Sequence, residues 1–170
     1  ATVPYTVLAT RSALLKRDGD VTSTNGNGPV AFNMAPGNYR VAVRHRNHLG
    51  CMTNTAIALG PTATFVDLSV ASTATYGAGA RKQVGTRMVL WPGDVSFNGQ
   101  VKYTGTGNDR DAVLIRVGGV SPTNVVNGLY NEDVNLDGEV KYTGSNNDRD
   151  IILQTIGGVV PTVVRTQQVP

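Results

Sequence analysis

The chain has 170 residues, with 15 Lys and Arg against 12 Asp and Glu, and its sequence pI is near 9.2. A chain of this length can form one ordinary domain or two small ones with a buried core. The single cysteine excludes an internal disulfide framework, and no apolar run is long enough to span a membrane. Because the basic balance comes without a nucleic-acid-binding motif, we expect no nucleic acid partner.

Residues 1–92 have a pattern typical of antiparallel β-structure. Asp18-Gly19 lies between two short runs of β-forming residues, which predicts a two-residue hairpin. Pro36-Gly37 predicts a type II turn, because proline presets the first central φ and glycine accepts a positive φ at the second. Further strands are expected over 2–9, 29–33, 56–59, 62–70 and 85–91, and together they favour a small antiparallel β-sandwich.

The clearest strand runs from Tyr39 to Arg46, where side chains alternate in character. One face, expected to meet a core, carries Tyr39, Val41, Val43 and His45. The other face carries three arginines and is expected to meet solvent or a partner.

Two stretches of this first part carry side chains that bind metals. His45, His48 and Cys51 are spaced three residues apart, but a fourth zinc ligand is missing. We therefore interpret His45 as partly buried and His48 as a turn cap. Asp18 and Asp20 offer oxygens for a third calcium ion, and hairpin chemistry explains the same residues without one.

The second part contains one motif twice, with Asp133 following Asp94 by 39 residues. Oxygen-bearing side chains stand at positions 1, 3 and 5 of each copy, and Gly99 or Gly138 stands at position 6, where a positive φ is expected. This pattern is typical of an EF-hand-like loop around Ca²⁺. The expected ligands are the side chains of Asp94, Ser96 and Asn98 with the carbonyl of Gln100, and the side chains of Asp133, Asn135 and Asp137 with the carbonyl of Glu139. The second copy has more formal charge and is expected to bind more tightly.

The end of each loop departs from the EF-hand pattern. Position 12 falls on Gly105 or Gly144, which cannot supply a carboxylate. We expect a four-residue insertion that makes Asp109 and Asp148 the closing ligands. The rival closers are Asp111 and Asp150, which fit equally well as capping partners at the third helical position of Asn-Asp-Arg-Asp.

A short helix is expected after each loop. Apolar residues recur at three-to-four spacing and a glycine pair follows each run, at Gly118-Gly119 and Gly157-Gly158. Neither copy can bury its apolar face alone, so the two are expected to pack as a pseudo-symmetric pair. The organisation expected is therefore a β-sandwich module over 1–92, a duplicated calcium-binding loop–helix module over 93–165 and a tail over 166–170.

Residues 93–165 resemble dockerin-type duplicated calcium repeats. They resemble more closely the C-terminal modules of large secreted surface proteins of Bacteroidetes-type bacteria, which carry similar DxNxDGxVKYxGxxNDRD units. The stretch from Asn38 to Gly50 is similar to the strand that precedes the repeats in that family. The resemblance implies a non-enzymatic module that is extracellular or on the bacterial cell surface.

No catalytic elbow, phosphate loop or isolated carboxylate pair is present, and the clustered acids are assigned to metal loops, so we expect no enzyme. The expected function is a calcium-stabilised structural module, a subunit of a self-assembling surface filament or matrix. Strand exchange between copies would use residues 1–8 or the tail from Val159 to Pro170. The alternative is a dockerin-like or adhesin-type binding module for a protein receptor or polysaccharide. Its candidate contacts are Arg110, Arg116 and Arg149 for a receptor, and Trp91, Tyr103 and Tyr142 for a glycan.

Overall fold

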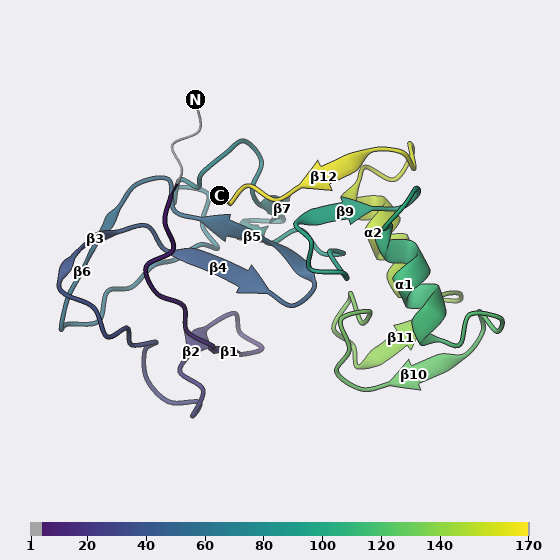
Figure 1. Cartoon of the computed structure of the whole chain (residues 1–170), viewed down its shortest axis with the longest axis horizontal. Coiled ribbons are helices and arrows are strands. Elements are labelled where there is room, and N and C mark those ends of the chain that lie inside the picture. The colour runs from purple at the N-terminus through teal and green to yellow at the C-terminus, as the bar shows by residue number, and fades with distance from the viewer. Residues whose placement is uncertain (1–4, 170) are drawn as a thin grey trace. The chain divides into compact units, whose positions relative to one another are not determined.

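A computed structural model describes residues 5–169 and is mainly β, with six two-stranded antiparallel sheets and two helices in that range (Figure 1). The sheets pair β1 (Leu14–Leu15) with β2 (Val21–Thr22), β3 (Gly37–Tyr39) with β6 (Ile57–Leu59), β4 (Ala42–His45) with β5 (His48–Met52), β7 (Lys82–Val84) with β8 (Arg87–Val89), β9 (Gln100–Lys102) with β12 (Val164–Thr166), and β10 (Val125–Asn127) with β11 (Glu139–Lys141). The helices are α1 (Asp109–Arg116) and α2 (Asp148–Thr155).

The described residues form two compact units. The N-terminal unit contains residues 5–39 and Ala56–Val66, and the repeat unit contains Arg40–Thr55 and Asp67–Val169. The sequence suggested a boundary at residue 92 instead. The difference arises because Leu49 of β5 is buried in the same core cluster as the two repeats, which joins the β4–β5 hairpin to them.

The N-terminal unit contains the expected β1–β2 hairpin, but its turn is longer than predicted. Lys16 N–H donates to the carbonyl of Asp20 at 2.8 Å, so three residues rather than two form the loop. Gly19 closes the loop with φ 95°. The type II turn expected at Pro36-Gly37 is wrong, because Gly37 begins β3 without a positive φ.

The long strand expected from Tyr39 to Arg46 is broken where the two units divide. Tyr39 ends β3 in the N-terminal unit, and β4 begins at Ala42 in the repeat unit. Within β4 the predicted alternation is confirmed, since Val43 and His45 are half-buried while Ala42 and Arg44 are exposed.

The expected β-sandwich is not confirmed. Residues 29–33 and 62–70 contain no strand, and neither does 5–9, the described part of the range 2–9. The ranges 56–59 and 85–91 do contain strands, β6 and β8. Every sheet in residues 5–169 has two strands, whereas a sandwich needs two larger sheets with facing apolar sides.

The repeat unit is built by a reciprocal exchange of strands. β10 follows α1 in the first copy but pairs with β11 of the second copy, and Val126 faces Val140. β12 follows α2 in the second copy and pairs with β9 of the first, where Arg165 faces Val101 (Figure 1). The tail expected to be a free strand donor is therefore already paired inside the chain from Val164 to Thr166.

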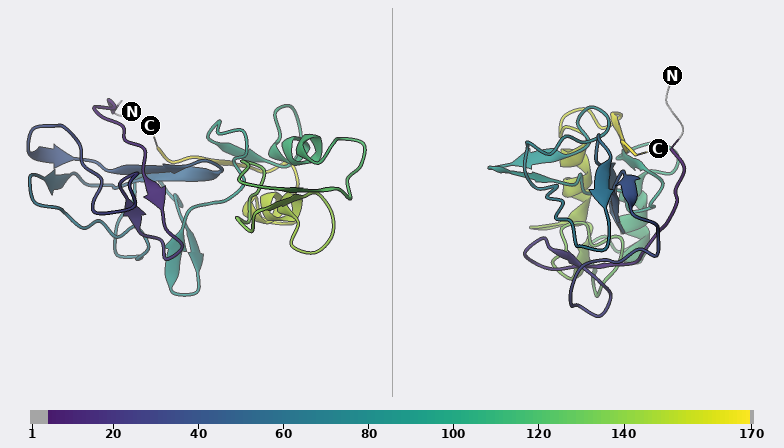
Figure 2. Two further views of the ribbon diagram at one scale, coloured as in Figure 1. Left: turned by 90° about the horizontal axis from the view of Figure 1, so that it is seen from below. Right: turned by 90° about the vertical axis from the view of Figure 1, so that its left-hand side faces the viewer.

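The two copies share one core, as the sequence predicted. Each buried position of the first copy has a buried counterpart 39 residues later: Val95 and Val134, Val101 and Val140, Val113 and Ile152, Val117 and Ile156. The helices pack against each other (Figure 2). Burying each of these side chains contributes about 1.5–3 kcal/mol, so the shared core stabilises both copies together.

Both helices end as predicted at their glycine pairs. Gly119 N–H donates to Leu114 and Gly118 N–H donates to Ile115, and the same two bonds recur after α2. Gly118 and Gly157 have φ angles of 109° and 113°. This is the Schellman arrangement, in which glycine takes the positive φ that ends the helix. No helix in residues 5–169 is long and apolar enough to cross a membrane.

Candidate functional site

Each of the two loops is wrapped around its first carboxylate. Asp94 is 1% exposed, and its two oxygens accept the N–H groups of Asn98 and Gly99, both at 2.9 Å. Asp133 is 0% exposed and accepts from Asp137 and Gly138 at 3.1 and 3.2 Å. The repeated sequence thus folds into a repeated hydrogen-bond pattern.

The backbone at the start of each loop, over residues 94–100 and 133–139, is left-handed at two positions. Gly99 and Gly138 have φ angles of 79° and 89°, as the sequence predicted. Phe97 and Leu136, two positions earlier, have φ angles of 54° and 62°, which the sequence did not suggest. A side chain with a Cβ at such a φ costs roughly 1–2 kcal/mol. The loop bonds must therefore hold a strained backbone in both copies.

Asp109 and Asp148 lie where the sequence placed the closing ligands. Asp109 is fully buried; one carboxylate oxygen accepts the N–H of Val95 at 3.0 Å and the other that of Lys102 at 2.9 Å. Asp148 is also fully buried and accepts from Val134 and Lys141 at 2.6 and 2.8 Å. The first carboxylate of each helix is therefore part of the loop before it.

The rival residues Asp111 and Asp150 act as capping partners. Asn108 is the N-cap of α1; its side chain accepts the N–H of Asp111 and donates to the Asp111 carboxylate. Arg110 forms an ion pair with the same carboxylate at 2.9 Å. Asn147, Arg149 and Asp150 repeat these contacts at α2. The geometry thus separates the two acids that the sequence left as alternatives.

The remaining candidate side chains bond to other residues of their own loops. Asn98 Oδ1 accepts the N–H of Gln100 at 2.8 Å, and Asp137 Oδ1 accepts that of Glu139 at 2.9 Å. Ser96 Oγ donates to Asp109, and Asn135 donates to Asp137. Each of these oxygens keeps a second lone pair. Gln100 and Glu139, whose carbonyls were expected as ligands, begin β9 and β11.

Two buried carboxylates in each loop repel each other. Burial, with a smaller contribution from the nearby Asp94 carboxylate, raises the pKa of Asp109 to about 6 against the opposing hydrogen bonds from Lys102 and Ser96. Burial is also the main cause of the raised pKa of Asp94 and of Asp148, and Asp133 adds to the latter. Burying two carboxylates near each other favours the binding of a proton or a cation at the pair.

The donor set fits a hard cation. Within residues 5–169, no group of three or more His, Cys, Asp and Glu side chains is gathered closely enough to hold a metal. Each loop instead offers two buried carboxylates together with hydroxyl, amide and backbone oxygens. Such oxygens suit Ca²⁺, whereas zinc prefers nitrogen and sulfur.

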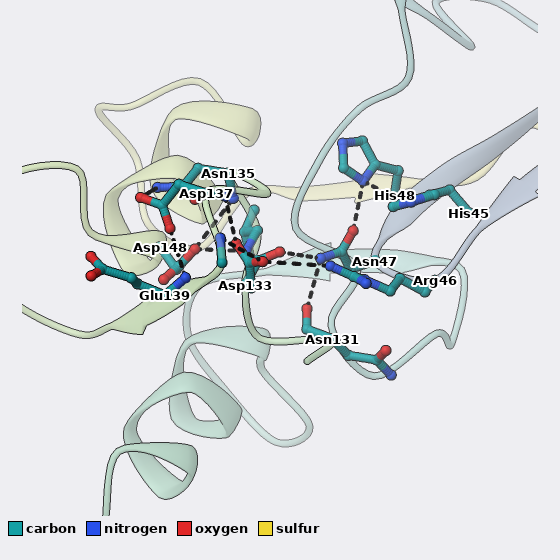
Figure 3. Close-up of polar contacts among 12 residues, drawn as sticks. His45, Arg46, Asn47, His48, Asn131, Asp133, Asn135, Asp137, Glu139 and Asp148 are labelled. Atoms are coloured by element: carbon teal, nitrogen blue, oxygen red, sulfur yellow. Dashed lines mark hydrogen bonds and ion pairs between the residues drawn. The ribbon is translucent and has the colours of Figure 1, made fainter. Parts of the chain in front are cut away.

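Two residues from the β4–β5 turn dock on the second loop (Figure 3). Asn47 is fully buried, and its Nδ2 donates to the carbonyls of Asp133 at 2.6 Å and Asn131 at 2.9 Å. Arg46 Nη2 lies 3.5 Å from Asp133 Oδ2. Sequence reasoning missed both residues, because nothing in the local pattern links a hairpin tip to a loop more than 80 residues later.

The two histidines contact each other. Their Nδ1 atoms are 3.0 Å apart, and Nδ1 of His48 is 2.8 Å from Asn47 Oδ1. Cys51 is buried, and burial raises its pKa to about 11. Because residues 48 and 51 of one strand point to opposite faces, Cys51 does not join the histidine pair.

The pair Asp18 and Asp20 shows hairpin chemistry. Asp18 Oδ1 accepts the N–H of Asp20 at 3.1 Å, and both residues are exposed. A third calcium ion at this turn stays a prediction.

Each residue suggested for receptor or glycan contact takes part in an arginine–aromatic contact. The guanidinium groups of Arg110 and Arg149 lie over the rings of Tyr103 and Tyr142 at 5.2 and 5.1 Å. The other contacts of this set are Arg116 with Tyr130 at 4.4 Å and Arg165 with Trp91 at 3.5 Å. These pairs explain the arginines and aromatics as packing within the repeat unit.

Comparison with known proteins finds no matching family model, no matching curated protein and no matching solved structure.

Proposed function

We propose that the repeat unit is a calcium-stapled structural module with one Ca²⁺ ion in each loop. The observation that carries the proposal is the pair of buried carboxylates in each copy, Asp94 with Asp109 and Asp133 with Asp148. A divalent cation removes the repulsion between them. The dockerin-like character of the duplicated loop–helix units belongs to the same proposal.

The first ion would be held by Asp94, Asp109, Ser96, Asn98 and the carbonyl of Gln100. The second would be held by Asp133, Asp148, Asn135, Asp137 and the carbonyl of Glu139. The ion would supply a link between the start of the loop and the start of the helix, which are already joined by backbone bonds to Asp109 and Asp148. At the millimolar calcium found outside cells, even weak sites of about 10⁻⁴ M are filled.

Titration calorimetry and melting curves with and without chelator test this proposal. We expect two ions per chain and a higher melting temperature with calcium. The double variant Asp94→Asn and Asp133→Asn should lose both effects, whereas Asp67→Asn, outside the loops, should keep them. No binding at millimolar calcium, with identical melting curves, would reject the proposal.

We further propose that the chain is a subunit of an extracellular filament or matrix. The support comes from the N-terminal unit, in which Thr22 is the one buried residue among those described. Leu14, Leu15 and Val21 of its hairpin are 43–53% exposed, and both sheets of the unit are two-stranded. A two-stranded sheet without a buried apolar face is marginally stable in water.

A second copy of the chain would cover these strands and complete a sandwich between subunits. Residues 5–8 stay a candidate donor segment, since Val7 and Leu8 are 73% and 67% exposed. Such head-to-tail exchange does not close on itself and builds filaments. Within the tail, Val164–Thr166 are already paired with β9 and are not free to act as a donor strand.

Electron microscopy and sedimentation at millimolar calcium test assembly. The wild-type protein should form filaments or large particles, and Leu15→Lys should prevent them. The matched control is Val120→Lys, because Val120 is 93% exposed and belongs to the repeat unit. Monodisperse wild-type monomers would overturn the assembly proposal and leave the calcium proposal standing.

A further inference from the structure

The β4–β5 turn makes the two loops chemically different. Their backbone bonds repeat, and so do the cap bonds of their helices. Arg46 breaks the symmetry, because it forms an ion pair with Asp133, whereas Asp94 and Asp109 form none within residues 5–169.

The contact between Arg46 and Asp133 is a charge contact without strong hydrogen bonds. The Nη2–Oδ2 distance is 3.5 Å, longer than the paired hydrogen bonds of a two-pronged arginine–carboxylate contact. Nε of Arg46 is buried and has no hydrogen-bond partner. The Arg46 side chain is 30% exposed and Asp133 is 1% exposed. Arg46 can therefore move toward solvent at small cost while Asp133 cannot.

Asn47 holds the turn in place independently of this charge. Its side chain bonds to two backbone carbonyls, those of Asn131 and Asp133. Neither bond uses the Asp133 carboxylate. The turn therefore stays docked whether or not Arg46 remains at Asp133.

The charges of the two donor sets become equal once Arg46 is counted. The first set contains two acidic side chains, Asp94 and Asp109, and the second contains three, Asp133, Asp137 and Asp148. The single positive charge of Arg46 offsets the third acid. Charge counting on the loops alone, which favours the second loop, omits this contribution.

We propose that Arg46 is a resident counter-ion that lowers the calcium affinity of the second loop to that of the first. The inference rests on the proposed function. Without calcium, Arg46 stabilises the buried Asp133 carboxylate. With calcium, the arginine competes with the ion for that carboxylate and is displaced from it. A partly exposed ion pair of this kind changes affinity by about fivefold.

Amide NMR reports each loop separately. Gly99 N–H donates to Asp94 and Gly138 N–H donates to Asp133, so each resonance follows its own loop during a calcium titration. The wild-type midpoints should agree within about threefold. In Arg46→Gln the calcium concentration at the midpoint of the Gly138 transition should fall about fivefold, which means tighter binding by the second loop. The midpoint for Gly99 should stay unchanged.

Two further variants keep the test decisive. Arg116→Gln removes the ion pair with Glu132, at 3.2 Å and outside both donor sets, and should change neither midpoint. Asp137→Asn alters an exposed side chain, so it should fold, and it should weaken the second loop about fivefold. Melting in chelator should be lower for Arg46→Gln than for the wild type, because Asp133 loses its counter-ion.

An unchanged Gly138 midpoint in Arg46→Gln would overturn the role of Arg46; if that variant does not fold, the two wild-type midpoints decide. A wild-type second loop that binds more than tenfold tighter than the first would also overturn it. If neither glycine responds to calcium in the wild type, the proposed function itself fails.

Discussion

The carboxylate of Asp109, at the first residue of α1, accepts the backbone N–H of Val95 at 3.0 Å across 14 residues of chain. Asp148 makes the equivalent bond to Val134 at 2.6 Å. Each bond fixes the start of a helix to the start of its loop. Whatever changes the charge of this carboxylate therefore changes the loop and the helix together.

Removal of calcium is expected to loosen the loops before the rest of the repeat unit. Each bound ion contributes about 2–3 kcal/mol when its free concentration is a hundredfold above Kd. Hydrogen exchange with chelator should show the largest loss of protection at the amides of Val95, Ser96 and Lys102, which donate to Asp109. Uniform loss of protection across both units would contradict this order.

Asp109→Asn and Asp111→Asn should have different effects. The first change removes a buried carboxylate of the first loop, and calorimetry should find one ion fewer. The second change removes a partly exposed capping partner. It should lower the free energy of unfolding, measured in urea, by about 1 kcal/mol, and both ions should still bind. Loss of an ion in Asp111→Asn instead would identify that residue as the ligand.

Leu136→Gly is expected to stabilise the protein by about 1 kcal/mol, because glycine accepts the positive φ of 62° without strain. Leu136→Ala is the control, since it removes the same exposed side chain but keeps the strained φ. Denaturant unfolding in calcium should separate the two variants. An equal rise in the free energy of unfolding of both variants would show that the exposed apolar side chain, and not the backbone φ, is unfavourable.

Acid should destabilise the wild-type protein through His48. Burial, with His45 and Arg46 close by, lowers the pKa of His48 to about 3. Between pH 6.5 and 3 the unfolded chain binds a proton at this residue that the folded chain does not bind, so the free energy of unfolding falls as pH falls.

Urea unfolding of the wild type and His48→Gln at pH 7 and pH 5 measures the effect. The wild type should lose about 1–2 kcal/mol more than the variant. The difference between the two proteins is the quantity to compare, because the raised pKa of Asp109 acts in the opposite direction in both. Equal losses would show that His48 is not held neutral.

Arg165→Ala should expose the chain's single tryptophan. The Arg165 guanidinium lies 3.5 Å from the Trp91 ring centroid, and its Nε donates to the carbonyl of Thr155 at 2.8 Å. We expect a red-shifted Trp91 emission and a loss of about 1 kcal/mol. Lys82→Ala is the control, because Lys82 Nζ lies 5.8 Å from the centroid of the same ring. This change should lower the free energy of unfolding by less than Arg165→Ala does.

The local features of the repeats could be predicted from the sequence. The bend glycines Gly99 and Gly138, both helices and their glycine stops follow from short-range hydrogen bonding, which a few neighbouring residues decide. The position of Asp109 at the loop could also be predicted, since the donors it needs are within the same copy. Calcium itself stays a prediction.

The β-sandwich expected for residues 1–92 depended on pattern alone. Strands were expected over 29–33 and 62–70, but a β-forming stretch becomes a strand only when a partner edge and a core are present. The N-terminal unit buries no apolar side chain among its described residues, so residues 29–33 and 62–66, which belong to it, have no core to face.

By itself the sequence determined that the chain holds two similar loop–helix copies with acids at matching positions. Only the tertiary structure decided that β10 pairs with β11 and β12 with β9, and that Arg46 and Asn47 reach the second loop. The physical reason is that equal copies present nearly equal strand edges, so local preference cannot choose between pairing within a copy and pairing across copies. The shared core of the folded chain decides which strand edges pair. It also brings the β4–β5 turn to the second loop, which lies far from it in the sequence.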